Sequence, residues 1–102
     1  MENIDLQSGK ITYNQFNIDF NVSYSRQIEE LLEDLIQIEY ENGYLIDLGW
    51  YPEYNPNGKF IVQVIKNYDW EKPIYKEQSR DKKKLKKILL KAINTLKDNN
   101  SK

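Results

Sequence analysis

The fold is decided by residues 44–66, which read YLIDLGWYPEYNPNGKFIVQVIK. In the first part of this stretch, large side chains occupy every second position: Tyr44, Ile46, Leu48 and Trp50. This period of two is typical of a β-strand. Asn-Pro-Asn-Gly at 55–58 is typical of a turn, in which proline sets one backbone angle and glycine takes a positive φ. Residues 59–66 carry apolar side chains on both faces, which predicts a central strand covered on both sides or partly by a partner. The stretch therefore predicts a β-hairpin within an antiparallel sheet.

The residues that flank this hairpin predict further strands. Residues 16–22 alternate apolar and polar side chains without error, which predicts a strand with one buried side: Phe16, Ile18, Phe20 and Val22. Ile11 and Tyr13 have the opposite parity, so either a turn or bulge near residues 14–15 resets the phase or two separate strands meet there. Two short edge strands are expected to complete the sheet, at 4–6 and, after Pro73, at 74–77.

A first helix is predicted over residues 25–41. Its apolar side chains recur at spacings of three and four: Ile28, Leu31, Leu32, Leu35 and Ile38. Ser25 is a suitable N-cap, and Asn42-Gly43 is a suitable left-handed stop.

A second helix is predicted over residues 80–96, capped by Ser79 and followed by a frayed tail at 97–102. The predicted fold class is therefore α+β, in a small single domain that spans residues 1–102. We expect an antiparallel sheet of about four to five strands with two helices packed on it, in the order β(β)-α-β-β-β-α.

The composition excludes several classes of function. The 102 residues include no cysteine and no histidine, so disulfides, thiol nucleophiles and the commonest general base are missing. No apolar run approaches the roughly 20 residues of a transmembrane helix, and no signal peptide is evident. We therefore expect a cytoplasmic binding protein that is not an enzyme and uses no metal or cofactor.

The net charge of −1 conceals a strong asymmetry along the chain. Residues 1–79 carry fourteen acidic and six basic side chains, a balance of −8. Residues 80–102 carry nine basic and two acidic side chains, a balance of +7. One question for the structure is whether these two regions face each other or face outside partners.

Two groups of residues are candidates for binding a partner. The first is a carboxylate cluster on the first predicted helix: Glu29, Glu30, Glu33 and Asp34. Pairs of these carboxylates lie four residues apart, so they could bind a divalent cation or act as an acid/base pair, although an ordinary solvated face is the plainer interpretation. The functional interpretation that we prefer is an acidic surface that attracts a cationic partner.

The second group combines aromatic and acidic side chains around the hairpin: Asp47, Tyr51, Glu53, Tyr54, Tyr68, Asp69, Trp70 and Glu71. The chain has thirteen aromatic residues, and such side chains dominate protein–protein hot spots. Trp50 is expected in the core, Tyr51, Tyr54 and Tyr68 are expected to be exposed, and Trp70 fits either place. Aromatic platforms beside acids also bind sugars, so a small carbohydrate-binding or enzyme domain stays open as a third class.

The last predicted helix offers an alternative function. Its lysines could neutralise nucleic-acid phosphates: Lys82, Lys83, Lys86, Lys87 and Lys91. The isoelectric point of about 5.5 is unlike that of a dedicated nucleic-acid binder, and a lysine flank is usually the solvated side of a helix.

Residues 47–60, DLGWYPEYNPNGKF, and 69–73, DWEKP, resemble small bacterial immunity proteins. These proteins are the cognate inhibitors encoded beside polymorphic and contact-dependent growth inhibition toxins. The likeness extends over roughly residues 28–96, and no residue-level role comes with it. It implies a cytoplasmic protein that binds a cognate toxin domain and blocks its active site or substrate groove. An acidic face suits a basic toxin domain, such as a nuclease that holds phosphates. Neither a membrane nor a nucleic acid is then the expected partner.

Overall fold

A computed structural model describes residues 4–100 of the chain, with side chains described for residues 4–96. Within that range the chain forms five strands, one α-helix and three short 3-10 turns. In chain order these elements are β1 (Lys10–Asn14), η1 (Tyr24–Arg26), η2 (Ile28–Glu30), β2 (Ile36–Glu39), η3 (Glu41–Gly43), β3 (Tyr44–Tyr51), β4 (Lys59–Lys66), β5 (Tyr75–Ser79) and α1 (Lys82–Asn100). The α+β class is confirmed, but the structure has one helix where the sequence predicts two.

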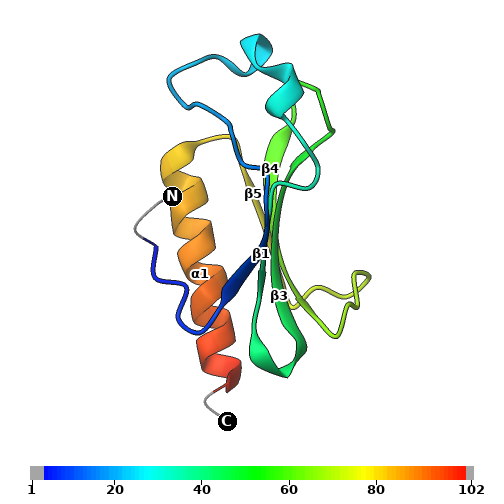
Figure 1. The fold of residues 1–102 in the computed structure, drawn as a ribbon, viewed down its shortest axis with the longest axis vertical. Coiled ribbons are helices and arrows are strands. Elements are labelled where there is room, and N and C mark those ends of the chain that lie inside the picture. The colour runs from blue at the N-terminus through cyan, green and yellow to red at the C-terminus, as the bar shows by residue number, and fades with distance from the viewer. Residues whose placement is uncertain (1–3, 101–102) are drawn as a thin grey trace.

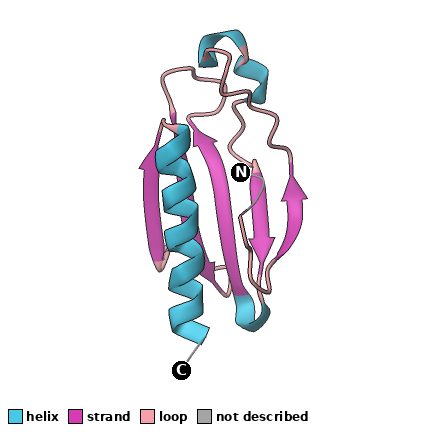
Figure 2. Cartoon of the chain, turned by 90° about the vertical axis from the view of Figure 1, so that its left-hand side faces the viewer, coloured by secondary structure: helices cyan, strands magenta, loops and turns pink. Residues whose placement is uncertain are grey.

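The strands form one antiparallel sheet in the order β1-β2-β3-β4-β5. Figure 1 shows the sheet nearly edge-on, with α1 against one side only. The helix contacts β3, β4 and β5, and Figure 2 shows it crossing in front of that half of the sheet. We call the covered side the helix face and the other side the open face.

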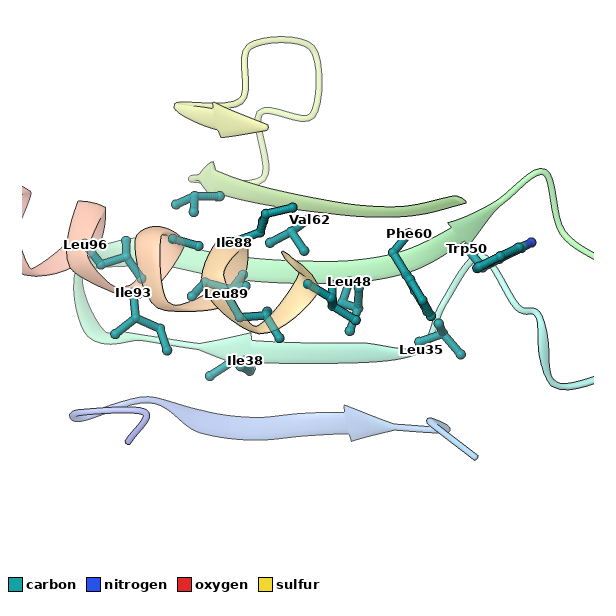
Figure 3. Close-up of a cluster of buried hydrophobic side chains, with 14 of the residues drawn as sticks. Leu35, Ile38, Leu48, Trp50, Phe60, Val62, Ile88, Leu89, Ile93 and Leu96 are labelled. Atoms are coloured by element: carbon teal, nitrogen blue, oxygen red, sulfur yellow. The ribbon is translucent and has the colours of Figure 1, made fainter. Parts of the chain in front are cut away.

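The predicted hairpin is confirmed with its predicted bounds. β3 pairs with β4 along its whole length, from Tyr44 opposite Lys66 to Tyr51 opposite Lys59. The even-numbered apolar residues of both strands point to the helix face, where Leu48 and Val62 lie next to the apolar side of α1, as Figure 3 shows. The helix contributes Leu85, Ile88, Leu89, Ala92, Ile93 and Leu96. Each large side chain buried there contributes about 1.5–3 kcal/mol to folding.

Trp50 lies in this core, as its parity predicts. Its side chain is 0% exposed, and its ring meets Phe60 edge-on with the ring centroids 4.9 Å apart. The indole Nε1 donates a hydrogen bond to the carbonyl of Asn55 at 2.7 Å, so the one polar atom of the ring is satisfied inside the core.

The helix predicted over 25–41 is wrong. The structure has the turns η1 and η2 there, followed by strand β2. Leu31 and Leu35 are both buried, so their spacing reports contact with the core and not a helical stripe. Asn42 and Gly43 do adopt left-handed φ angles, of 69° and 81°, but they close the β2–β3 hairpin. Asn-Gly is the strongest short hairpin signal, and it decides the structure here.

The strand predicted over 16–22 is also wrong. This segment is a loop, although Ile18 is buried and Phe16 and Phe20 pack against the core. The Gln27 side chain takes the place of a strand partner. Its Nε2 donates to the carbonyls of Asp19 and Val22 at 2.8 and 2.9 Å, and its Oε1 accepts from the amide of Asp19 at 2.9 Å. Backbone groups that are satisfied by one buried amide have no need of a sheet.

The strand predicted at 4–6 is absent from the described residues, where Ile4 and Leu6 pack against the core without pairing. Ile11 and Tyr13 instead belong to β1, which carries a bulge between them. The prediction for 74–77 is close, because β5 is an edge strand displaced by one to two residues.

The last helix begins later and ends later than predicted. Asp81, not Ser79, is its N-cap, because its Oδ2 accepts from the amide of Lys84 at 3.0 Å. The Ser79 hydroxyl accepts from the amide of Asp81 at 2.9 Å. The tail predicted to fray is helical as far as Asn100, and residues 101–102 lie outside the described residues.

In the loop of the β3–β4 hairpin, the residue with a positive φ is Tyr54, at 63°, and not Gly58 as predicted.

Candidate protein-binding face

The open face has no helix against it among the described residues, and two loops stand on its side of the sheet. These are the β3–β4 loop, residues 52–58, and the β4–β5 loop, residues 67–74, both visible in Figure 1 on the side away from α1. Between them, Gln37, Asp47 and Gln63 form one row across β2, β3 and β4. A row of apolar side chains, Leu45 and Ile65, lies beside it and is buried.

A bulge before β2 brings two carboxylates to this face. The amide of Leu35 donates a hydrogen bond to the carbonyl of Leu48 at 3.1 Å, and the amide of Trp50 donates one to the carbonyl of Leu32 at 2.8 Å. Between these two hydrogen bonds, Glu33 and Asp34 both lie opposite the single residue Gly49, which is the arrangement of a β-bulge. A Cβ at Gly49 would lie 1.8 Å from the carbonyl oxygen of Glu33. Only glycine leaves room for the chain to pass so close.

Four carboxylates gather around the Tyr51 side chain. Burial is the largest cause that raises the pKa of its hydroxyl to about 12. The rest of this rise in pKa comes from the nearby charges, in decreasing order, of Asp47, Asp34, Glu33 and Glu53. Glu53 is held in place because its Oε1 accepts from the amide of Glu33 at 3.1 Å.

The stretch that carries these charges is acidic, although two lysines share the open face, Lys59 opposite Tyr51 and Lys76 opposite Gln63. Residues 27–58 contain eight acidic side chains and no lysine or arginine. The structure therefore brings four of the predicted acids, and Tyr51 with them, to one end of the open face, where their fields add.

Asp47 differs from the other three carboxylates because it is buried. Only 2% of its surface is exposed, and its Oδ1 accepts from Gln37 Nε2 at 3.1 Å. Burial raises the pKa of this carboxyl to about 6; the hydrogen bond from Gln37 lowers the pKa and the charge of Asp34 raises it. At pH 7 the group is still mostly ionised, so the face keeps its charge.

The two flanking loops present exposed aromatic rings. Tyr54, Tyr68 and Trp70 are 54%, 67% and 44% exposed. Tyr54 and Tyr68 also have left-handed backbones, with φ of 63° and 59°. Such a conformation costs about 1–2 kcal/mol for a residue with a side chain, so the loops hold both rings outward at some expense in stability. The predicted exposure of Tyr54 and Tyr68 is confirmed, whereas Tyr51 is half-buried.

The remaining predicted residues take different positions. Asp69 and Glu71 are exposed on the β4–β5 loop, where the Tyr68 hydroxyl donates to Glu39 Oε1 at 3.1 Å. That hydrogen bond raises the pKa of Tyr68. Glu29 and Glu30 lie on η2, and their charges are not among those that act on the Tyr51 hydroxyl. They are not part of the open face.

Sequence reasoning missed Gln37 and Gln63, the amides on each side of Asp47. Gln63 could have been found, because it is a polar residue inside the apolar run of 59–66. Gln37 was hidden by the prediction of a helix there.

The predicted basic residues lie on the other side of the molecule. All are exposed on α1: Lys82, Lys83, Lys86, Lys87 and Lys91. Lys82 also lies over the ring of Phe20, with Nζ 5.6 Å from the centroid. The acidic and basic regions therefore face opposite directions and do not neutralise each other.

Among the described residues, no group of three or more acidic side chains is arranged to hold a metal ion. Within the same part of the chain, no helix is both long and apolar enough to cross a membrane. No protein family, curated protein or solved structure matches this chain.

Proposed function

We propose that this chain is a protein-binding inhibitor, of the kind an immunity protein is, and that its open face covers a basic surface of its partner. One observation carries the proposal. Carboxylates that are distant in sequence meet at Tyr51 on the side of the sheet without a helix, between two loops that present aromatic rings. Charge and aromatic anchors on one accessible face are what a protein interface requires.

The two kinds of side chain have different roles. The exposed acids Glu33, Asp34 and Glu53 attract a basic partner over several ångströms and increase the rate of association. The rings of Tyr54 and Trp70 become buried on contact and slow dissociation. Because the loops already hold these rings outward, little ordering is needed on binding.

The partner chemistry that fits this face is a protein with a phosphate-binding groove. Such grooves are rich in lysine and arginine, so an acidic face complements them and occupies the space that a nucleic acid would take. A nuclease toxin domain has this chemistry. Inhibition would follow from occlusion, without any reaction by this chain.

The proposal is tested by affinity purification from the native host, followed by kinetics with the purified partner. The test variant is Glu33→Gln/Asp34→Asn/Glu53→Gln, and the matched control is Lys86→Gln/Lys87→Gln/Lys91→Gln on α1. We expect the test variant to lower the association rate constant by at least about tenfold at low salt, and the control to leave it unchanged or raise it. Equal association rates for the wild type and the test variant would contradict the proposal.

A second candidate function rests on the exposed lysines of α1, which point away from the acidic face. Contact with phosphates there would make nucleic-acid binding weaken linearly with salt on a log–log plot. Titration with duplex DNA and with RNA from 50 mM salt upward measures that slope. Absence of binding at 50 mM salt would dispose of this candidate.

A further inference from the structure

Asp47 is the one charged side chain buried among residues 4–96. Its Oδ1 accepts the hydrogen bond from Gln37, while its Oδ2 has no hydrogen-bond partner among the described residues. In that part of the chain, the buried side-chain atoms that lack a partner are the hydroxyls of Tyr40 and Tyr75, and Oδ2 of Asp47 is not one of them. That oxygen is therefore open to solvent at the floor of the open face, where its acceptor positions are available to a partner.

The surroundings of Asp47 determine how it can be reached. Ile46 and Leu48, its neighbours on β3, fill the core on the helix face. Only the open face gives access to Oδ2. On that face Asp47 lies between Gln37 and Gln63 in the row that crosses the sheet.

Tyr51 lies beside this row on the same strand and the same face. Its Cε2 is 2.9 Å from the position of a Cβ on Gly49, so the ring lies over that glycine, between Tyr51 and Asp47 in the strand. Of the four charges that act on the Tyr51 hydroxyl, that of Asp47 has the largest effect. A planar ring and a carboxylate with a free oxygen are thus adjacent.

We propose that Asp47 binds an arginine side chain of the partner when the open face is covered. This inference rests on the proposed function and names the partner's side chain at that face. A cation at Oδ2 donates charge-assisted hydrogen bonds in place of water, and exclusion of water from the interface strengthens the attraction. The charge that destabilises the free chain then stabilises the complex.

Arginine fits these groups better than lysine. The guanidinium is planar and weakly hydrated, so it stacks on a tyrosine ring and is removed from water at a lower cost. Its several donors can bind more than one acceptor oxygen at once. An ammonium group is a strongly hydrated point charge with no plane to stack.

The test is an NMR titration of the full chain with two probes, a nine-residue arginine peptide and a nine-residue lysine peptide. We expect the wild type to bind the arginine peptide at least about fivefold more tightly, with the side-chain amide signals of Gln37 and Gln63 shifting. Asp47→Asn should remove this preference. Glu41→Gln, which makes the same change of charge at an exposed position on η3, should keep it. Gln63→Leu should reduce the preference as an independent check.

The outcomes separate this inference from the proposed function. Equal affinities of the wild type for the two peptides, or an arginine preference that survives in Asp47→Asn, would overturn the role of Asp47. In both of these cases the triple variant Glu33→Gln/Asp34→Asn/Glu53→Gln tests the proposed function separately. Weaker binding of both peptides by that variant would still support the proposal that the acidic face attracts a basic partner. If that triple variant binds both peptides as tightly as the wild type, the acidic face does not attract cations, and the proposed function fails with the inference.

Discussion

Replacement of Asp47 by asparagine should make the free protein more stable at pH 7. The pKa of this carboxyl is raised from 3.8 to about 6 by burial. A tenfold change in proton affinity between the folded and unfolded chains corresponds to about 1.4 kcal/mol. The ionised carboxylate therefore lowers the free energy of unfolding by up to about 3 kcal/mol at pH 7. Asparagine removes that charge and can still accept the hydrogen bond from Gln37.

The dependence on pH follows from the direction of the shift. Between about pH 4 and pH 6 the folded chain binds more protons at Asp47 than the unfolded chain does, so this group makes the wild type less stable as pH rises. Above about pH 6 its contribution is constant, and below about pH 4 it vanishes. The stability gained by Asp47→Asn should therefore be largest at pH 7 and close to zero at pH 4.

The assay is urea denaturation at pH 4, 5, 6 and 7 for the wild type, Asp47→Asn and the exposed-site control Asp69→Asn. We expect a gain of about 1–3 kcal/mol for Asp47→Asn at pH 7, and no change for the control beyond about 0.5 kcal/mol. A variant that is less stable at pH 7, or a gain that is the same at every pH, would refute the reasoning.

Three further perturbations test the account. Gly49→Ala places a methyl group against the Glu33 carbonyl and should cost about 2 kcal/mol or more in urea denaturation; a loss below about 0.5 kcal/mol would show that the bulge adjusts easily. Alanine at Tyr54 or Trp70 should leave the melting temperature within a few degrees of the wild type but weaken the partner complex by about 2 kcal/mol each, measured by calorimetry; unchanged affinity would remove these rings from the interface. Arg80→Ala removes guanidinium hydrogen bonds to carbonyls of the hairpin loop and should cost about 1.5–3 kcal/mol in denaturant unfolding; a neutral result would mean that the loop needs no such support.

The central hairpin was predictable because its signals are local. The period of two in 44–51, the turn at 55–58 and the apolar run of 59–66 all specify the same structure. The core position of Trp50 follows from the same parity. The apolar stripe of the last helix is likewise a local signal, although the cap was misplaced by two residues and the helix extends beyond its predicted end.

The region before the hairpin was not predictable in this way. Leu31, Leu35 and Ile38 fit a helical spacing, but the β-branched residues of 36–39 and the turn at Asn42-Gly43 favour a strand and a hairpin. The alternation in 16–22 is equally misleading, because Gln27, outside that segment, satisfies its backbone. Tertiary contacts decide both segments.

The candidate site was predictable as a set of residues but not as an arrangement. Glu33, Asp34, Asp47 and Glu53 can be chosen for their charge alone. Their meeting depends on the bulge opposite Gly49, which only the folded sheet reveals. Glu29 and Glu30 carry the same charge and lie elsewhere, so composition could not separate them.

The account depends most on which side of the sheet meets the partner. Hydrogen–deuterium exchange of the purified complex, compared with the free chain, measures this directly. We expect slower exchange in the complex at residues 31–34, 51–54 and 67–71, with residues 82–91 of α1 unchanged. Slower exchange confined to α1, or no change at the three open-face segments, would contradict the account.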